Sequence, residues 1–333
     1  MNQSPAIYVS CPDKDTPSGG IRKLYQHVDV LNKHGFRSYI VHQQEGFRCT
    51  WFHSDTPVVY QARVEPEINP SDYLVIPEYY GPDICDYRPG IRKVILNQGA
   101  HLTFTGYPLD KHSLKTPYRH PDVVATLVVS QHSHDYLRYI FPELPLFRIH
   151  NGINTDLFKF SADKKRQIAF MPRRLPQDIN QVINMLKFRG ALEDFELVPI
   201  HDVTEPEVAA ILQESLIFLS FSDREGCGLP PQEAMACGCI VIGYHGNGGK
   251  EFFDESFCYP VEATDTIAFS RTVEAVIGEY RQNHASLREK AKRGAEFIMN
   301  TYFPEREAAD IIGCWKSICA FDEQRVDRAA TAS

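Results

Sequence analysis

The sequence predicts an α/β fold with two doubly wound parallel sheets. Short apolar segments of strand length alternate with segments whose apolar residues recur at helical spacing. This pattern is typical of parallel strands joined by crossover helices. The alternation breaks once, in the polar and turn-rich residues 151–165, and then restarts. We therefore expect two domains joined by a linker, with a ligand bound in the cleft between them at the C-terminal ends of strands.

The first half of the chain begins with an apolar strand at Ala6–Ser10, followed by a polar loop that ends in Ser18-Gly19-Gly20. The next apolar residues recur at helical spacing and predict a helix that Gly35 ends; they are Ile21, Leu24, Val28 and Leu31. Further apolar runs predict strands at Arg37–His42, Tyr73–Pro77, Lys93–Asn97, Ala125–Ser130 and Leu146–His150.

The second half repeats the alternation and ends in a long helical tail. Strands are predicted at Gln167–Met171, Phe195–Ile200, Leu216–Ser220 and Cys239–Gly243. Helices are predicted at Ile179–Phe188, Glu205–Gln213 and Pro231–Cys237, and over most of the chain from Asp265 to about Ala320. We expect an N-terminal domain over residues 1–152 and a C-terminal domain over 153–303. Residues 304–333 then form a helix that packs back on the N-terminal domain, with a frayed tail from Arg328.

Composition excludes several classes of function. The chain has 35 Lys and Arg against 43 Asp and Glu, a net charge of −8, which argues against broad nucleic-acid binding. Its nine cysteines include no C-x-x-C pair, a pattern that indicates reduced thiols rather than a disulfide framework. No signal peptide is visible at the N-terminus, and no apolar run approaches the roughly 18 residues that span a bilayer. We expect a cytoplasmic protein.

Residues 220–251 hold the candidate chemistry. A predicted strand ends at Ser220, and the loop that follows carries Glu225 and the glycine pair of Gly226-Cys227-Gly228. Pro230-Pro231 then opens a helix, because the fixed φ of proline suits the first turn. Glu233 is expected in that first turn, where the helix dipole favours a carboxylate. Both glutamates can therefore face one site.

Such a pair of carboxylates suits a ligand that carries both hydroxyl groups and phosphates. Carboxylates accept hydrogen bonds from the neighbouring hydroxyls of sugars, while a glycine loop and a helix N-terminus together offer backbone N–H groups to an anion. The alternative is structural. Two glutamates eight positions apart arise readily by chance among 43 acidic residues, and Glu233 could serve only to stabilise the helix.

The same segment resembles a known family. The run SDREGCGLPPQEAMACG over residues 222–238 is similar to the E-x7-E segment of the retaining enzymes of glycosyltransferase family 4. The strand Cys239–Gly243, the turn Gly246–Gly249 and Glu251 follow in the family's order. Upstream, HNGINTDLF at 150–158, MPRRL at 171–175 and Ser18-Gly19-Gly20 also resemble family motifs. The resemblance spans roughly residues 5–260 and implies the GT-B fold of two Rossmann-like domains.

The resemblance also implies roles for particular residues. Glu225 would contact the hydroxyls of the donor hexose, and Glu233 would bind the ribose. Arg173 or Arg174 would stabilise the diphosphate leaving group, since the guanidinium fork suits phosphate oxygens. The remaining positions would bring backbone close to the sugar and phosphates; they are Gly19, Gly20, Gly226, Cys227, Gly228 and Leu229.

Two features leave this assignment open. The family usually has a Lys about five residues after the arginine, but Asp178 and Ile179 stand there; the doubled Arg173-Arg174 is one replacement. The family also often places a His near the reacting centre, after a middle strand. We take His101 as the candidate, ahead of His132 and His134, with a purely structural histidine as the alternative.

The predicted function is retaining transfer of a hexose from a nucleotide-diphosphate sugar to a saccharide or lipid-linked acceptor. UDP-glucose or a related UDP-hexose is expected as donor on family frequency, with GDP-mannose next. The resemblance implies no cofactor and no metal, and Asp13-Lys14-Asp15 is interpreted as a solvated loop. Peripheral contact with the inner face of a membrane would suit a lipid-linked acceptor. The oligomeric state is not predicted.

Three alternatives remain beside this interpretation. A GT-B-like sugar-nucleotide epimerase or hydrolase would share the cleft but need no acceptor. A sugar-nucleotide-binding subunit without catalysis would fit the missing Lys. A dinucleotide-dependent oxidoreductase is disfavoured, because no G-x-G-x-x-G lies between the first strand and the first helix.

Overall fold

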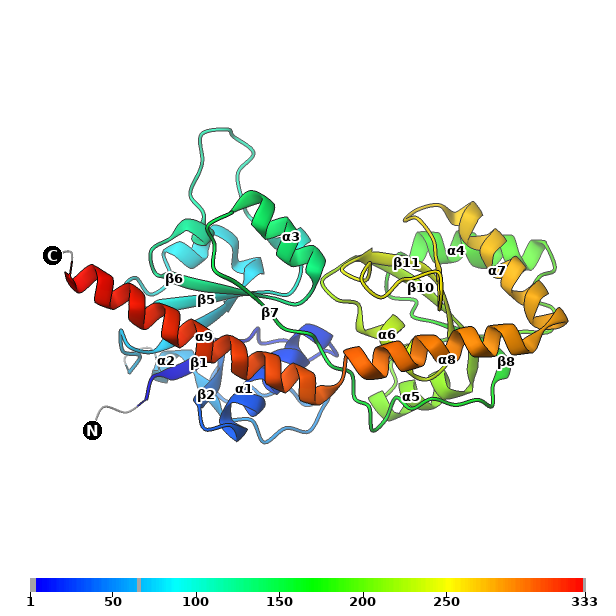
Figure 1. Ribbon diagram of the computed structural model, residues 1–333, viewed down its shortest axis with the longest axis horizontal. Helices are drawn as coiled ribbons and strands as arrows, with labels where there is room; N and C mark the ends of the chain where they lie inside the picture. The colour runs from blue at the N-terminus through cyan, green and yellow to red at the C-terminus, as the bar shows by residue number, and fades with distance from the viewer. Residues whose placement is uncertain (1–3, 65–66, 332–333) are drawn as a thin grey trace. The chain divides into compact units, whose positions relative to one another are not determined.

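The computed structural model describes residues 4–64 and 67–331. The chain divides into two compact units, residues 1–150 with 307–333, and residues 151–306. Each unit holds one sheet, drawn in Figure 1, and neighbouring strands run parallel throughout both sheets. The predicted α/β class with two doubly wound parallel sheets is confirmed.

The sheet of the first unit has seven strands in the order β3-β2-β1-β4-β5-β6-β7. Six of them were predicted: β1 (Ala6–Ser10), β2 (Arg37–His42), β4 (Tyr73–Pro77), β5 (Arg92–Asn97), β6 (Val123–Val128) and β7 (Leu146–Arg148). The short edge strand β3 (Val58–Tyr60) was missed, because three residues carry no periodicity. The strand order reverses between β1 and β4, which marks the expected ligand edge of a doubly wound sheet.

Helices cover both faces of this sheet. On one face, α1 (Gly19–Lys33) and α9 (Pro304–Thr331) pack on Ile7 and Val9 of β1. On the other face, α3 (Gln131–Ile140), which the sequence did not predict, contributes the buried Leu137. The remaining helical segments of this unit are short; they are α2 (Gln61–Val64) and the 3₁₀ turns η1 (Glu78–Cys85), η2 (Ala100–Leu102) and η3 (Pro117–Arg119).

Helix α9 is held on the first sheet by a buried tryptophan and by buried polar contacts. Trp315 is fully buried, and its indole Nε1 donates to Nε2 of His27 at 2.7 Å. Further along, the carboxylate of Asp322 contacts the guanidinium of Arg92 at 3.0 Å. Figure 1 shows this helix, in red, beside α1 and β1. Residues 332–333 of the predicted frayed tail lie outside the described residues.

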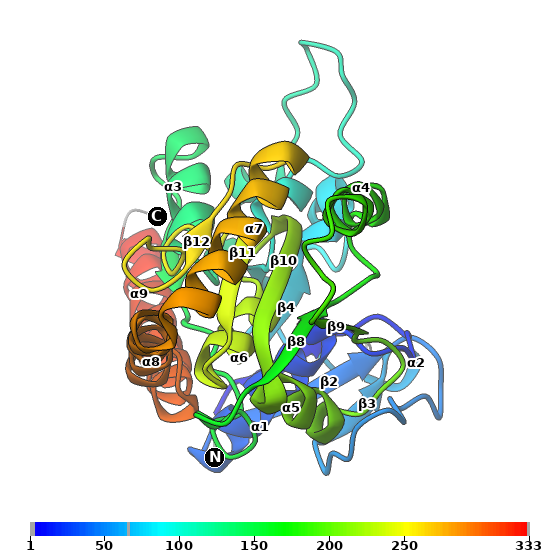
Figure 2. The same cartoon turned by 90° about the vertical axis from the view of Figure 1, so that its right-hand side faces the viewer.

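The sheet of the second unit has five strands in the order β12-β11-β10-β8-β9, side by side in Figure 2. Two strands are longer than predicted. β10 (Ser215–Glu225) continues past Ser220, and β11 (Ile240–Asn247) continues past Gly243. Polar side chains hid both extensions, but the backbone pairing persists to Glu225 opposite Asn247. The others are β8 (Lys165–Phe170), β9 (Glu196–Pro199) and the unpredicted β12 (Tyr259–Pro260).

The helices of the second unit also lie in two layers. α4 (Pro176–Phe188) and α7 (Thr266–Gln282) pack on one face of the sheet. α5 (Glu205–Glu214), α6 (Leu229–Ala236) and the C-terminal part of α8 (His284–Thr301) pack on the other. The predicted linker 151–165 is not a free connector, because Ile153 and Phe158 are buried in this second layer.

Two further observations concern the described residues as a whole. None of their helices is long and apolar enough to cross a membrane. All nine cysteines are free thiols, and all but Cys319 are buried, where a thiol packs as a small apolar group.

Removing the buried side chain of Trp315 from α9 should destabilise the first unit. We expect Trp315→Ala to lower the free energy of unfolding by roughly 3–5 kcal/mol, since it leaves a large cavity. Urea unfolding followed by fluorescence and circular dichroism measures this change. The exposed neighbour Lys316 provides the control, because Lys316→Ala should shift stability by no more than about 0.5 kcal/mol. Equal effects of the two substitutions would contradict the role of Trp315.

Candidate active site

The two predicted glutamates lie on either side of a buried glycine loop in the second unit. Glu225 is the last residue of β10, and its carboxyl group is partly buried. Gly226, Cys227 and Gly228 are buried and lead directly into α6. Gly228 adopts a left-handed conformation, with φ of 76°, at the N-cap of that helix, a position that favours glycine.

Helix α6 begins earlier than predicted, at Leu229 rather than Pro231. Pro230 and Pro231 therefore occupy its second and third positions, and two of the first-turn N–H groups do not exist. An anion at this end would depend on the amides of the glycine loop and Leu229. Gly238 ends the helix as predicted, with φ of 84° and its N–H donating to the carbonyl of Met235.

Glu233 is the fifth residue of α6, so the prediction that it lies in the first turn is wrong. It stands four residues after Leu229 and therefore on the same face of the helix. Because helical side chains lean toward the N-terminus, we expect its carboxylate on the side of the glycine loop. The argument from the helix dipole is therefore weakened, and the role of Glu233 in the site stays a prediction.

A second glycine turn packs against the first. A Cβ at Gly248 would lie 2.1 Å from the carbonyl oxygen of Gly226, and one at Gly246 would lie 2.3 Å from that of Asp223. The N–H of Gly248 also donates to the carbonyl of Glu225 at 3.2 Å. Only glycine permits so close an approach of two backbones. The run Gly246–Gly249 therefore fixes the end of β10 and the position of Glu225.

Arg174 lies directly against Glu225. Its Nη2 is 3.1 Å from Oε1 of the glutamate, and about half of the arginine side chain is exposed. Burial raises the pKa of Glu225, while the nearby Arg174 and Arg173 lower it and Asp223 raises it further. A guanidinium is suited to phosphate oxygens and a carboxylate to hydroxyl groups, so this pair could bind a ligand that carries both.

Both arginines stand on the turn between β8 and α4. Leu175 follows them with φ of 42°, a left-handed conformation that costs a branched residue about 1 kcal/mol or more. Asp178 is one of the two positions, with Ile179, at which the resemblance to family 4 implies a Lys, and its Oδ2 accepts a hydrogen bond from the Tyr244 hydroxyl at 3.0 Å. Neither Asp178 nor Ile179 is a cation, so Arg173 and Arg174 are the positively charged residues of this turn.

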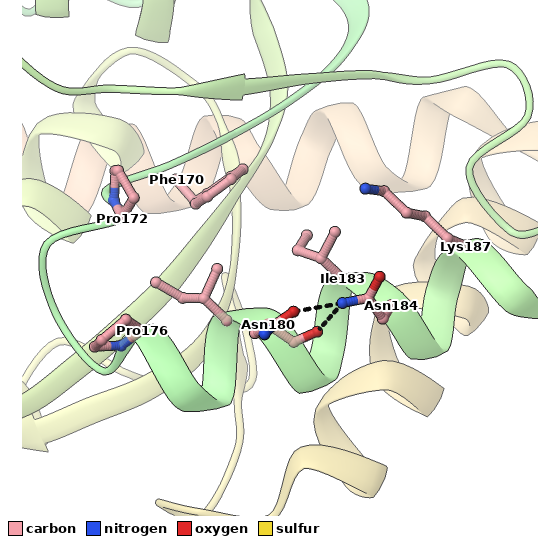
Figure 3. Close-up of a pocket in the computed structure, with 8 residues that line it drawn as sticks. Phe170, Pro172, Pro176, Asn180, Ile183, Asn184 and Lys187 are labelled. Carbon is pink, nitrogen blue, oxygen red and sulfur yellow. Dashed lines mark hydrogen bonds between the residues drawn. The ribbon is translucent and has the colours of Figure 1, made fainter.

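A pocket of about 390 Å³ lies on one side of the same turn. Figure 3 shows Pro172 and Pro176, which flank the two arginines, together with residues along one face of α4. Lys187 stands at the far end of the pocket from Pro176. None of the predicted site residues lines it, so the candidate site rests on the glycine loops and not on this pocket.

The predicted residues of the first unit lie at the C-terminal ends of its strands. Gly19 and Gly20 begin α1, and a Cβ at Gly20 would lie 3.2 Å from Oε1 of Gln98. His101 is exposed in η2, three residues past Gln98. The structure thus brings the glycine turn and the histidine to one edge of the sheet.

Sequence reasoning missed a buried acid at this edge. Glu78 follows β4 directly and is 2% exposed. A Cβ at Gly99 would lie 3.7 Å from Oε1 of Glu78. The same Cβ would lie 2.9 Å from Cε1 of the His101 ring. The only sequence signal was a carboxylate immediately after an apolar strand, a position where polar residues of α/β sites are often found.

Asp13 and Asp15 support the loop after β1. Asp13 accepts hydrogen bonds from Nδ1 of His42 at 2.9 Å and from the backbone of Gln44 at 2.6 Å. Asp15 accepts two from Thr50, each at 2.7 Å. Over residues 4–64 and 67–331, no group of three His, Cys, Asp or Glu side chains could hold a metal ion.

Comparisons with known proteins agree with this geometry. Residues 192–294, which include both glutamates and both glycine turns, match the family model of glycosyl transferases group 1. An α-1,6-glucosyltransferase of Actinobacillus pleuropneumoniae serotype 7 is 29% identical over 243 residues, or 69% of each chain.

Solved structures show the same fold at low identity. The sucrose-phosphate synthase of Thermosynechococcus elongatus aligns with a TM-score of 0.65 and 13% identity, covering 99% of this chain and 100% of that one. HepE of Anabaena in complex with UDP aligns with a TM-score of 0.67 and 11% identity, covering 94% and 100%.

The fold is therefore the GT-B fold of glycosyltransferases. More particularly, the match of residues 192–294 to the glycosyl transferases group 1 model and the similarity to a glucosyltransferase support a glycosyltransferase activity for this chain. The resemblance to family 4, the retaining mechanism and the roles of single residues stay predictions.

The close approach of the two glycine turns can be tested by stability. We expect Gly248→Ala to lower the free energy of unfolding by about 1–3 kcal/mol, because its methyl group overlaps the Gly226 carbonyl. Gly278 lies within α7 with open space around its Cα, so Gly278→Ala should stabilise by about 0.5–1 kcal/mol. Thermal and urea unfolding of both variants decide the matter, and a Gly248→Ala protein as stable as the parent would refute the contact.

Proposed function

We propose that this glycosyltransferase is a retaining hexosyltransferase that uses UDP-glucose or a related UDP-hexose. The acceptor is a hydroxyl of a saccharide or glycolipid, in polysaccharide or glycoconjugate synthesis. The observation that supports this most is the contact between Arg174 and Glu225 at 3.1 Å, beside the buried backbone of Gly226–Gly228. This pair supports the proposal, because a guanidinium suits phosphate oxygens and a carboxylate suits sugar hydroxyls.

The choice of donor draws on the compared proteins. The curated relative is named an α-1,6-glucosyltransferase, and the Anabaena protein has been solved with UDP and with UDP-glucose. A pneumococcal O-GlcNAc transferase of the same fold has been solved with UDP and GlcNAc. These ligands favour a uridine nucleotide and a gluco-configured sugar for this chain too.

The residues suggest how the reaction would proceed. Arg173 and Arg174 neutralise the diphosphate as it leaves the anomeric carbon, aided by the amides of Gly226–Leu229. Glu225 accepts hydrogen bonds from the hexose hydroxyls, and Glu233 from the ribose. The acceptor hydroxyl attacks from the face that the diphosphate leaves, and the departing phosphate accepts its proton. No protein base is needed in this scheme.

One observation favours a second candidate, a sugar-nucleotide-binding subunit without transfer. Neither Asp178 nor Ile179 supplies the Lys that the resemblance implies, and Asp178 instead accepts a hydrogen bond from Tyr244, so the leaving group would lack that cation. Donor binding without turnover across a broad acceptor panel would support this alternative. Product analysis of the same incubations also detects epimerisation or hydrolysis of the donor.

The role of Glu225 gives a direct test. We expect Glu225→Ala to lower kcat/KM for transfer by roughly 100-fold or more, since it removes a buried acceptor of substrate hydroxyls. Glu225→Gln, which keeps one carbonyl acceptor, should lose less. The exposed Glu255 supplies the control Glu255→Ala, with unchanged activity. If a folded Glu225→Ala protein transfers sugar at the parental rate, the assignment fails.

The nucleotide can be identified by thermal shift with UDP, GDP and ADP and their sugars. A ligand that binds only the native state adds about 2.7 kcal/mol of stability at one hundred times its Kd. We expect the largest rise in Tm with UDP and UDP-glucose, and a smaller one in Arg174→Ala. A larger rise with GDP would replace the UDP assignment by GDP-mannose.

A further inference from the structure

A buried carboxyl group stands at the ligand edge of the first sheet. Glu78 directly follows β4 and is 2% exposed, its Oε1 would lie 3.7 Å from a Cβ at Gly99, and the backbone N–H groups of Gln98 and Gly99 lower its pKa against the effect of burial. Its second oxygen, Oε2, has no hydrogen-bond partner among the described residues. A buried carboxyl oxygen without a partner is costly, so its presence calls for an explanation beyond packing.

The position of Glu78 in the sheet is the second observation. β4 lies between β1 and β5, and the order of the strands reverses between β1 and β4. Ligands of doubly wound sheets bind where the order reverses, at the C-terminal ends of the strands. The loop after β1 leads to Gly19-Gly20, and the loop after β5 carries Gln98. The two loops are in contact, because a Cβ at Gly20 would lie 3.2 Å from Oε1 of Gln98.

Gly99 links the acid to the histidine. A Cβ at this residue would lie 2.9 Å from Cε1 and 3.1 Å from Nδ1 of His101, and 3.7 Å from Oε1 of Glu78. The carboxyl group and the imidazole therefore flank the same short stretch of backbone. Any side chain at Gly99 would displace the imidazole ring.

We propose that Glu78 is a positioning residue that holds the Gln98–Gly99 backbone and thereby fixes the imidazole of His101 at the ligand edge of the first sheet. The inference rests on the proposed function in one respect, namely that His101 acts during transfer. The acid itself reaches His101 only through the backbone that it binds.

The ionisation of Glu78 should set how firmly the turn is held. Burial raises its pKa to about 7, against the opposing effect of the backbone hydrogen bonds. The titratable groups around it are the phenols of Tyr79 and Tyr118, from η1 and η3, and the imidazole of His101 from η2. As the pH rises through about 7 the carboxyl group ionises, and its bonds from the two N–H groups become charge-assisted and stronger.

Transfer kinetics give the first test, with Glu78→Gln, Glu78→Leu, His101→Ala and the double variant Glu78→Leu/His101→Ala. We expect Glu78→Leu to lower kcat at least 10-fold with the KM for UDP-glucose unchanged. The double variant should be no slower than His101→Ala, since both changes remove one function. Glu78→Gln should keep activity within about 3-fold at low pH but lose the rise of kcat near pH 7. The exposed Glu143 supplies the control Glu143→Gln.

A readout without turnover separates this inference from the proposed function. His101 is exposed, so its modification by diethylpyrocarbonate can be followed by peptide mass mapping, with the exposed His112 as internal reference. We expect Glu78→Leu to change the rate at His101 at least 3-fold and to leave His112 unaffected. A parent protein without transfer activity would refute the proposed function but not this result.

The inference is overturned by any of three results. These are additive losses in the double variant, a parental pH profile in Glu78→Gln, or an unchanged modification rate of His101 in Glu78→Leu. Should Glu78→Leu fail to fold, Glu78→Gln decides the question through its pH profile and its His101 rate.

Discussion

The candidate donor site depends on one constraint, the close approach of two backbone segments at the ends of β10 and β11. The carbonyls of Asp223 and Gly226 lie where the Cβ atoms of Gly246 and Gly248 would be. This contact continues the pairing of the two strands beyond their apolar parts and fixes Glu225 opposite Asn247. The bend at Gly228 and the start of α6 follow from it. The position of both glutamates is thus a property of the backbone, which side-chain contacts then refine.

The two units place different electrostatic conditions at their ligand edges. In the second unit, Arg174 and Glu225 are partly exposed and form an ion pair, which suits a ligand that is itself charged. In the first unit, the carboxyl group of Glu78 is buried, which raises its pKa, and nearby backbone N–H groups favour its ionised form.

The sequence alone predicted most strands of both sheets, because apolar runs of strand length are unambiguous when buried on both faces. It failed where backbone pairing continues under polar side chains, as in residues 221–225 of β10. It also failed at Glu78, which is buried beside Gly99, a residue distant in the sequence. Burial and contacts between loops depend on the tertiary structure, so the local sequence does not indicate them. The two arginines show the same limit. The sequence named Arg174 as a candidate but did not predict its contact with Glu225.

The placement of α9 has a consequence for how the protein is made on the ribosome. The first unit is discontinuous in sequence, since its core includes Ile311, Trp315 and Ile318 as well as residues of the first 150. At ordinary elongation rates, residues 151–306 take roughly 10 to 30 s to synthesise. During that interval the apolar surface around Val9 and Leu24 is not yet covered by α9. The second unit, in contrast, can already fold. The nascent chain is therefore expected to need protection from aggregation at this surface until the last helix emerges.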